Sequence, residues 1–246
     1  MHKFFVTPKD IRGNSITITG EDVHHIKKVL RMDIGDELMV SDGNGKDYIC
    51  KIDSFLKGIV KCTIIEKLNV NAESPLSIIL YQCLPKSDKM ELIIQKCTEL
   101  GVKEIVPVIS SRTIVKMEDD KRDKKLERWN KIARESAKQS NRAYVPIVRP
   151  PLNFEKALEE ISELDLGIIP WEKENGNGLK HVLRDRKGVR DIGIMIGPEG
   201  GFSNEEVDKA RKCGLISVTL GPRILRTETA GFVIVSIVMY EIGDMG

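Results

Sequence analysis

The sequence predicts an α/β fold, in which a mostly parallel sheet with helices on both faces follows a small β-rich domain. From residue 77 onward, short runs rich in Ile, Val and Leu alternate with helical patterns, which is typical of a parallel sheet covered on both faces. The first seventy residues instead hold short alternating segments separated by turn residues. We therefore expect two domains, 1–70 and 76–246, joined by a polar linker at 71–75.

The first domain is expected to contain four strands and one short helix. The strands are predicted at residues 15–19, 37–40, 48–53 and 59–65, with the turn sequence DGNG at 42–45 before the third. The helix is predicted over 22–31, where apolar residues recur at helical spacing.

The second domain is expected to alternate strands with helices. The strands are predicted at residues 78–81, 104–109, 165–170, 192–197 and 217–220. The helices are predicted at residues 89–100, 121–142, 154–163, 204–213 and 228–242. Ser203, with Glu206 three residues later, forms a capping-box pattern at the start of the fourth of these helices.

The charge distribution says more than the net charge, which is only +2. Residues 121–149 contain ten Lys or Arg residues against three acids. Such a stripe fits a surface that meets phosphate groups, although a solvated helix face is an equally good interpretation.

Several functional classes lack their sequence signatures. The five cysteines are scattered and the four histidines have no metal-ligand spacing, so neither a disulfide framework nor a metal site is expected. No G-x-G-x-x-G or P-loop pattern is present. The longest nearly uninterrupted apolar run, 232–240, is too short to span a bilayer. No secretory signal is recognisable either, and we expect a cytoplasmic protein without a membrane partner.

Two glycine-rich loops, IGPEGG at 196–201 and LGPRILR at 220–226, follow predicted strands. In open α/β sheets ligands bind beyond the carboxyl ends of the strands, and glycine lets the backbone approach a ligand closely. One such loop is often only a turn. Two in tandem indicate a binding site.

These loops belong to a set of motifs that covers the whole chain. Together with LPKSDKME at 84–91 and QKCTELGV at 95–102, they resemble the RsmE family of SPOUT ribosomal RNA small-subunit (16S) uridine-N3 methyltransferases. The resemblance implies a β-barrel-like (PUA/OB-type) RNA-binding domain before a trefoil-knotted SPOUT domain. It also implies a homodimer, S-adenosyl-L-methionine as cofactor, and 16S rRNA, within the small ribosomal subunit, as substrate. Ser87 stands where many relatives carry glycine.

On this resemblance, three residues are candidates for the methyl-transfer chemistry. Arg226 could stabilise negative charge on the uracil or anchor a phosphate, and its alternative role is a salt bridge to Glu228 or Glu199. Glu199 and Glu228 are alternative proton acceptors, while Glu228 could instead only stabilise a helix N-terminus.

The other candidates divide by ligand. Those for the cofactor lie mostly in the two loops: Ile169, Ile196, Gly197, Gly200, Leu220, Gly221, Ile224, Leu225 and Thr229. Those for RNA are basic or polar: Lys27, Lys28, Arg31, Lys86, Arg112, Arg134, Gln139 and Arg142. Gln139 and Arg142 could instead cap the end of their helix.

Three other functions remain open from the residues. A SPOUT enzyme could act on transfer RNA or on a ribose hydroxyl, and rRNA nucleoside analysis separates these cases. An RNA-binding module with vestigial glycine loops would not bind the cofactor. A small-molecule nucleotide enzyme is disfavoured by the absent phosphate motifs.

Overall fold

The chain forms two compact units. The computed structural model describes residues 1–68, 73–114, 119–184, 186 and 188–246, and only the backbone of 119–121. The first unit comprises Met1–Glu73 and Ala137–Val145, and the second comprises Ser74–Ser136 and Pro146–Gly246. The predicted linker 71–75 and the side chain of Lys121 fall partly or wholly outside the described residues. The boundaries at 70 and 76, as limits of independently folding domains, stay a prediction.

The first unit is built on a six-stranded sheet, whose strand order is β1-β4-β5-β6-β3-β2. Its strands are β1 (Lys3–Phe5), β2 (Ile11–Arg12), β3 (Ser15–Thr19), β4 (Glu37–Ser41), β5 (Asp47–Leu56) and β6 (Ile59–Leu68). Only the β1–β4 pair is parallel. Alternate residues of β3 to β6, such as Ile16, Ile18, Leu38 and Val40, are buried in one apolar core.

The helix predicted at 22–31 is shorter and partly π-helical. It consists of α1 (Glu21–His24) followed directly by η2 (His25–Val29), a π-helical turn. Arg31 then takes a left-handed backbone conformation with φ 54°, which an L-residue adopts only at a cost. The helix therefore ends before Arg31, and that side chain is exposed.

A segment distant in the sequence completes the first unit. Helix α3 (Asp119–Gln139) was predicted to reach residue 142, but Asn141 is left-handed with φ 60°. The N–H of Arg142 bonds back to the carbonyl of Ala137 at 2.9 Å, as in many helix C-terminal motifs. The chain beyond the helix packs on the sheet, where Ser41 Oγ donates to the carbonyl of Ala143.

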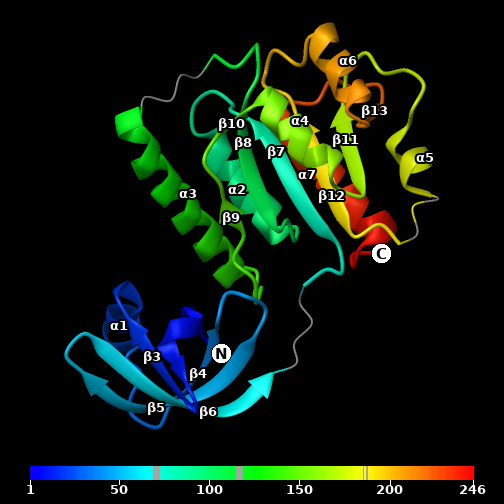
Figure 1. The fold of residues 1–246 in the computed structure, drawn as a ribbon. Coiled ribbons are helices and arrows are strands. Elements are labelled where there is room, and N and C mark those ends of the chain that lie inside the picture. The colour runs from blue at the N-terminus through cyan, green and yellow to red at the C-terminus, as the bar shows by residue number, and fades with distance from the viewer. Residues whose placement is uncertain (69–72, 115–118, 185, 187) are drawn as a thin grey trace. The chain divides into compact units, whose positions relative to one another are not determined.

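The second unit contains a seven-stranded sheet in which every described pairing is parallel (Figure 1). Its main order is β10-β8-β7-β12-β11-β13, and β9 pairs with β8. The strands are β7 (Ser77–Cys83), β8 (Glu104–Ile109), β9 (Ile147–Val148), β10 (Leu152–Asn153), β11 (Leu166–Pro170), β12 (Asp191–Ile196) and β13 (Ile216–Val218). The predicted α/β class with a parallel sheet is confirmed.

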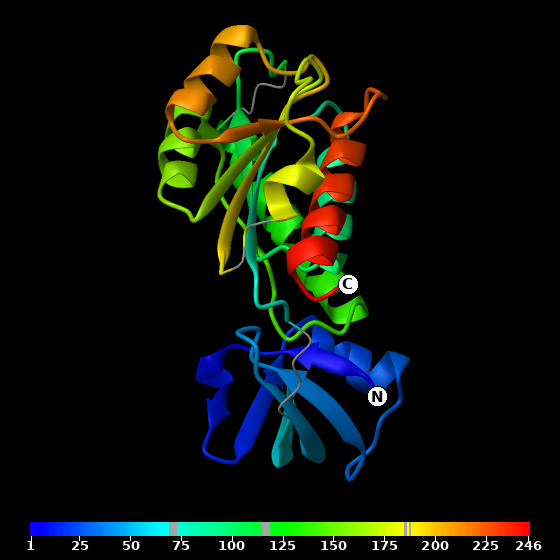
Figure 2. The same cartoon turned by 90° about the vertical axis from the view of Figure 1, so that its right-hand side faces the viewer.

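Helices cover both faces of this sheet (Figure 2). Helices α2 (Lys89–Glu99), α3, α5 (Leu179–Arg184) and α7 (Thr227–Ile242) pack on one face, and α4 (Phe154–Ser162) and α6 (Asn204–Lys212) on the other. None of the helices in the described chain is long and apolar enough to cross a bilayer. The predicted helices at 89–100, 154–163, 204–213 and 228–242 correspond to α2, α4, α6 and α7, and the capping box of Ser203 and Glu206 is present.

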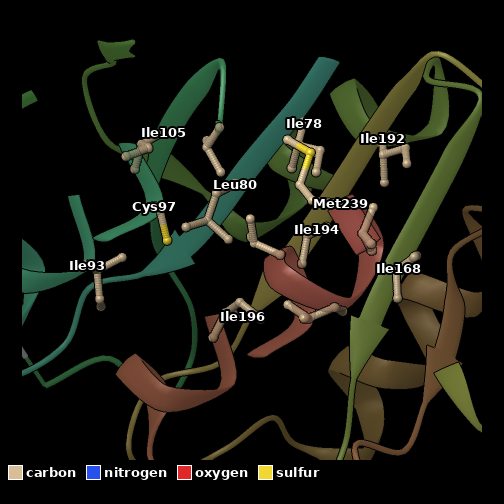
Figure 3. Packing of buried hydrophobic residues seen from close by; sticks show 14 of the residues in the cluster. Ile78, Leu80, Ile93, Cys97, Ile105, Ile168, Ile192, Ile194, Ile196 and Met239 are labelled. Atoms are coloured by element: carbon tan, nitrogen blue, oxygen red, sulfur yellow. The ribbon is translucent and has the colours of Figure 1, made fainter. Parts of the chain in front are cut away.

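The strand residues alternate between two apolar cores. Ile78 and Leu80 of β7 and Ile192, Ile194 and Ile196 of β12 face α2 and α7 (Figure 3). Tyr81, which follows Leu80, and Met195, which stands between Ile194 and Ile196, face α4 and α6. Because both faces are buried, the strands read as continuous apolar runs in the sequence.

Candidate functional site

A pocket of 310 Å³ lies where β11, β12 and β13 end. Because these strands are parallel, the loops that follow them meet at the same edge of the sheet. The pocket is lined by residues of these three loops and of the first turns of α7: Pro170, Trp171, Glu172, Ile196, Gly197, Pro198, Glu199, Gly200, Gly201, Phe202, Thr219, Leu220, Gly221, Arg223, Ile224, Leu225, Thr227 and Ala230. Both glycine-rich loops recognised in the sequence are therefore part of one pocket.

Local geometry explains the glycine at 221. Its φ is +106°, a conformation that L side chains rarely adopt. Thr219 Oγ1 accepts a hydrogen bond from the N–H of Gly221 at 3.2 Å, which closes the turn directly after β13. The turn directs the following residues, Ile224 and Leu225, back over the pocket.

A buried hydrogen-bond chain joins three elements beneath the pocket. Gln82, at the end of β7, donates from Nε2 to Thr227 Oγ1 at 2.9 Å. The Thr227 hydroxyl in turn donates to the carbonyl of Gly197 at 2.6 Å. Gln82 is fully buried and Thr227 is 5% exposed, so the first turn of α7 is held against the loop after β12 by bonds that water does not replace.

A second connection among the same elements is ionic. Lys89, the first residue of α2, lies with Nζ 3.1 Å from Glu199 Oε1 and 3.3 Å from Glu228 Oε2. Glu199 Oε1 also accepts the backbone N–H of Lys86 at 3.0 Å. Ser87, next in the chain, has φ 57°, which gives a physical reason for the glycine expected there.

These contacts set the protonation of the Glu199 and Lys89 side chains. Partial burial alone raises the pKa of Glu199, but its own backbone N–H, Lys89 and the N–H of Lys86 outweigh this effect, and the net pKa is lowered. The hydrogen bond to Glu199 raises the pKa of Lys89, and Glu228 adds to this against an opposing effect of desolvation. The pair is therefore ionised at neutral pH.

Arg112 anchors the pocket loop from the connection after β8. Its guanidinium donates to the carbonyl of Gly200 at 2.8 Å and to that of Phe202 at 3.3 Å. Glu206 of α6 fixes the same connection, because Glu206 Oε1 accepts the N–H of Ser111 at 2.8 Å. Arg112 was predicted to bind RNA; it holds the loop and is exposed, and RNA binding by this residue stays a prediction.

The loop after β11 supplies residues that the sequence patterns did not reveal. Trp171 and Glu172 line the pocket, and the cations of Arg211 and Lys173 lie over the Trp171 ring at 5.4 and 5.9 Å. Their only signal in the sequence was their place directly after the strand predicted at 165–170.

Glu174 holds this loop against β13. Its carboxylate accepts hydrogen bonds from Ser217 Oγ, the N–H of Gly176 and Arg211. The pKa of Glu174 is consequently lowered to about 2, with the Ser217 hydroxyl as the largest cause and the Gly176 N–H next.

We expect Glu174→Gln to lower the free energy of unfolding at pH 7 by about 1.5 kcal/mol, since hydrogen bonds to a charged acceptor are lost. A carboxylate with a depressed folded-state pKa stabilises above its unfolded value near 4.5, and that stabilisation is lost as the pH falls towards 2. The difference between wild type and variant in urea unfolding should therefore shrink between pH 4.5 and 2. Glu172→Gln on the same loop is the control, and an equal, pH-independent loss in both variants would contradict the prediction.

Most of the predicted cofactor residues lie together. Seven of the nine line the pocket: Ile196, Gly197, Gly200, Leu220, Gly221, Ile224 and Leu225. Ile169 does not, because it is fully buried in the core beneath α4 and α6. Thr229 lies in the first turn of α7 outside the lining residues.

Of the three predicted catalytic residues, one lines the pocket and two lie next to its lining residues in the sequence. Glu199 lines it, and Glu228 contacts Lys89 in the first turn of α7. Arg226 is the N-cap residue of α7, between the lining residues Leu225 and Thr227, and its side chain is exposed. The alternative of a salt bridge from Arg226 to either glutamate is not found in the described residues, where Lys89 pairs with both.

The predicted RNA-binding residues are divided between the two units. Lys27, Lys28 and Arg31 are exposed on the first unit, with Lys27 Nζ 5.4 Å from the Phe55 ring. The Lys86 side chain is exposed, Arg134 is half-buried, and Gln139 is exposed.

The prediction that Arg142 binds RNA needs correction. Arg142 is only 4% exposed, and its Nη2 atom lies 2.7 Å from Glu73 Oε2. It fastens the segment beyond α3 to the end of the first unit's Met1–Glu73 chain. A buried, paired guanidinium is not presented to RNA.

Acidic partners also neutralise part of the positive charge that the sequence count gives to the basic stripe at 121–149. At least four of its ten cations pair with acids from elsewhere in the chain. Arg128 pairs with Glu91, Lys138 with Asp22, Arg142 with Glu73, and Arg149 with Glu104 and Glu160. Counting charges within 121–149 could not include these partners.

Known proteins match both units. A family model described as an RNA methyltransferase domain matches residues 72–239, and one described as an RNA methyltransferase PUA domain matches residues 18–66. The chain is 37% identical to ribosomal RNA small subunit methyltransferase E of Bacillus subtilis (strain 168), over 98% of this chain and 97% of that protein. It is 36% identical to the protein of the same name from Aquifex aeolicus (strain VF5), over 97% of this chain and 99% of that protein.

A solved structure agrees with these relatives. The ribosomal RNA small subunit methyltransferase E of Neisseria gonorrhoeae, bound to S-adenosyl methionine, superimposes with a TM-score of 0.89 at 31% identity and covers 100% of both chains. The first unit thus contains a PUA domain, and the second has the SPOUT-type methyltransferase fold that the motifs implied. The chain belongs to the RNA methyltransferase family whose members include ribosomal RNA small subunit methyltransferase E.

Proposed function

We propose that this protein transfers a methyl group from S-adenosyl-L-methionine to N3 of a uridine in 16S rRNA. The observation that carries the proposal is the pocket of 310 Å³ formed by both glycine-rich loops, in a chain whose relatives are named for methylation of small-subunit rRNA. A volume of this size lies within the range of small-molecule sites.

The pocket's chemistry fits this cofactor. Ile196, Leu225 and the Trp171 ring offer apolar surface to an adenine, and the glycines at 197, 200 and 221 bring backbone groups to the ligand. The Glu172 carboxylate in the wall can accept hydrogen bonds from ribose hydroxyls. When bound there, S-adenosylmethionine supplies an electrophilic methyl group.

The remaining chemistry belongs to the chain's own residues. The N3 nitrogen of uracil carries a proton and lies on the base-pairing edge, so the base must be unpaired to react. As N3 gains the methyl group it loses this proton, and negative charge develops on the flanking carbonyl oxygens. The guanidinium of Arg226, exposed beside the pocket, would stabilise that charge.

Of the two predicted proton acceptors, we favour Glu228. Glu199 Oε1 already accepts hydrogen bonds from Lys86 and Lys89, and its lowered pKa makes it a weaker base. Glu228 Oε2 is near the Lys89 ammonium but accepts no hydrogen bond within the described residues. Glu228 therefore retains more capacity to accept the N3 proton, directly or through water.

The finer details of substrate and assembly rest on the resemblance of the sequence motifs to the RsmE family. We infer that the rRNA is methylated within the small ribosomal subunit and that the protein acts in the cytoplasm as a homodimer. The half-buried Phe232 and the exposed Tyr240 on α7 offer apolar surface to a second copy. The trefoil knot implied by the motifs also belongs to this proposal.

The exposed cations of the first unit are proposed to contact the RNA backbone. Reversal of Lys27, Lys28 and Arg31 to glutamate should weaken binding of small-subunit rRNA and reduce the slope of log K against log salt by roughly 2 to 3. Filter binding between 50 and 300 mM salt measures both. The matched control reverses Lys9, Lys61 and Lys67, which are also exposed on the first unit. If the two triple variants had equal slopes, the proposal that Lys27, Lys28 and Arg31 contact the RNA would be wrong.

Titration calorimetry with S-adenosylmethionine, followed by transfer of labelled methyl groups to small-subunit rRNA, tests the proposal. We expect one cofactor per chain and label in the rRNA. An RNA-binding module with vestigial loops would produce no heat with the cofactor, and a transfer RNA enzyme would label transfer RNA instead.

A further inference from the structure

Lys89 occupies a position that helix stability alone disfavours. It is the first residue of α2, where the helix dipole makes a cation unfavourable by about 0.3–1 kcal/mol. Glu228, in the first turn of α7, is by contrast at a favourable position for an anion. The helix dipole therefore does not account for a lysine at the start of α2, and the contacts of its ammonium group do.

The ammonium of Lys89 joins two carboxylates from other elements. It lies 3.1 Å from Glu199, in the wall of the pocket, and 3.3 Å from Glu228, in the first turn of α7. The three side chains are only partly exposed, at 30%, 28% and 13%. Without the cation, the two carboxylates would face the same space and repel each other.

The ion pairs of Lys89 join the same helix and the same loop as the buried hydrogen bonds of Gln82 and Thr227 do. Gln82, Thr227 and Gly197 join the end of β7, α7 and the loop after β12 through hydrogen bonds. Lys89, Glu228 and Glu199 join the start of α2 to the same helix, one residue further along, and to the same loop, two residues further along. Beyond Gly197, the loop that carries Gly200 and Gly201 into the pocket is held by this second connection, together with the N–H of Lys86 and the guanidinium of Arg112.

We propose that Lys89 is a positioning residue for methyl transfer, which holds the 198–201 segment of the pocket wall and the Glu228 carboxylate in their working arrangement. It acts through the two glutamates and lies outside the pocket lining. The proposal rests on the proposed function for its kinetic consequences, but its structural consequence is independent of that function.

The structural consequence is tested in the protein without any ligand. In Lys89→Met, amide hydrogen exchange should become faster in residues 198–202 and in the first turn of α7. Lys96→Met is the matched control, because Lys96 of the same helix forms an ion pair with Glu99 alone among the described residues, at 2.9 Å. Thermal stability should change little in either variant, since partly exposed ion pairs contribute little and the N-terminal cation is itself unfavourable.

The kinetic consequence is a change in cofactor binding and in kcat, without a change in the KM for rRNA. We expect Lys89→Met to weaken cofactor binding about fivefold and to reduce kcat about tenfold, with KM for rRNA unchanged. Lys89→Arg should restore most of both values. Exchange and kinetics equal to wild type in Lys89→Met would overturn the proposal. Faster exchange in a protein whose wild type neither binds the cofactor nor transfers methyl groups would instead overturn the proposed function alone.

Discussion

An Arg226→Ala protein should bind S-adenosylmethionine with nearly unchanged affinity but methylate rRNA roughly 100- to 1,000-fold more slowly, the usual effect of losing a donor to transition-state charge. The physical reason is the location of the residue. Arg226 caps α7 with its backbone, makes no capping hydrogen bond with its side chain, and is exposed beside the pocket. Its removal therefore takes away a cation without disturbing the packing that forms the pocket.

Single-turnover methylation with saturating cofactor measures this effect directly. Arg226→Lys is the control, because it keeps a positive charge but not the planar guanidinium, and it should retain intermediate activity. If Arg226→Ala transfers methyl groups at the wild-type rate, the residue has no part in stabilising charge on the uracil.

Thr227→Val should lower the free energy of unfolding by about 1–3 kcal/mol, because it leaves one partly buried and one buried polar group without a partner. These are the carbonyl of Gly197 and one N–H of the Gln82 amide. Since Gly197 lies in the pocket wall, we also expect a marked loss of cofactor affinity.

Thr227→Ser separates the hydroxyl from the shape of the side chain. It keeps the donor and acceptor and should stay close to wild type in urea unfolding and in calorimetry with the cofactor. Valine and serine variants of equal stability would mean that the hydrogen-bond chain contributes nothing beyond packing.

Periodicity was sufficient to predict the architecture of the second unit. The runs at 78–81, 104–109 and 192–197 are buried on both faces, so their apolar character is continuous and easily recognised. The two glycine-rich loops were placed at one edge of the sheet for the same reason, because parallel strands send their carboxyl ends in one direction. Seven of the cofactor residues proposed on the family resemblance lie in these loops and line the pocket.

Contacts between distant segments could not be predicted in this way. Lys89 and Glu228 are far apart in the sequence, and only the packing of α2 beside α7 brings them together. Arg142 belongs to the basic stripe at 121–149 and was expected to bind RNA, whereas its partner Glu73 lies in another segment. The helix that was predicted to reach residue 142 ends early because Asn141 has a left-handed backbone. Asparagine also occurs inside many helices, so the residue type alone did not reveal this end.

Short elements escaped prediction for a related reason. Strands β1, β2, β9 and β10 have only two or three residues each, too few for a period to emerge. Ile169 was assigned to the cofactor as an apolar residue near the end of its strand, but strand alternation turns its side chain to the core under α4.

Mass spectrometry of 16S rRNA nucleosides, from a strain lacking this protein and from the same strain supplied with it, tests the central claim most directly. We predict that 3-methyluridine is absent from the rRNA of the first strain, returns with the wild-type protein, and does not return to its full level with Arg226→Ala. A full level of 3-methyluridine in the strain without the protein would contradict the proposed reaction.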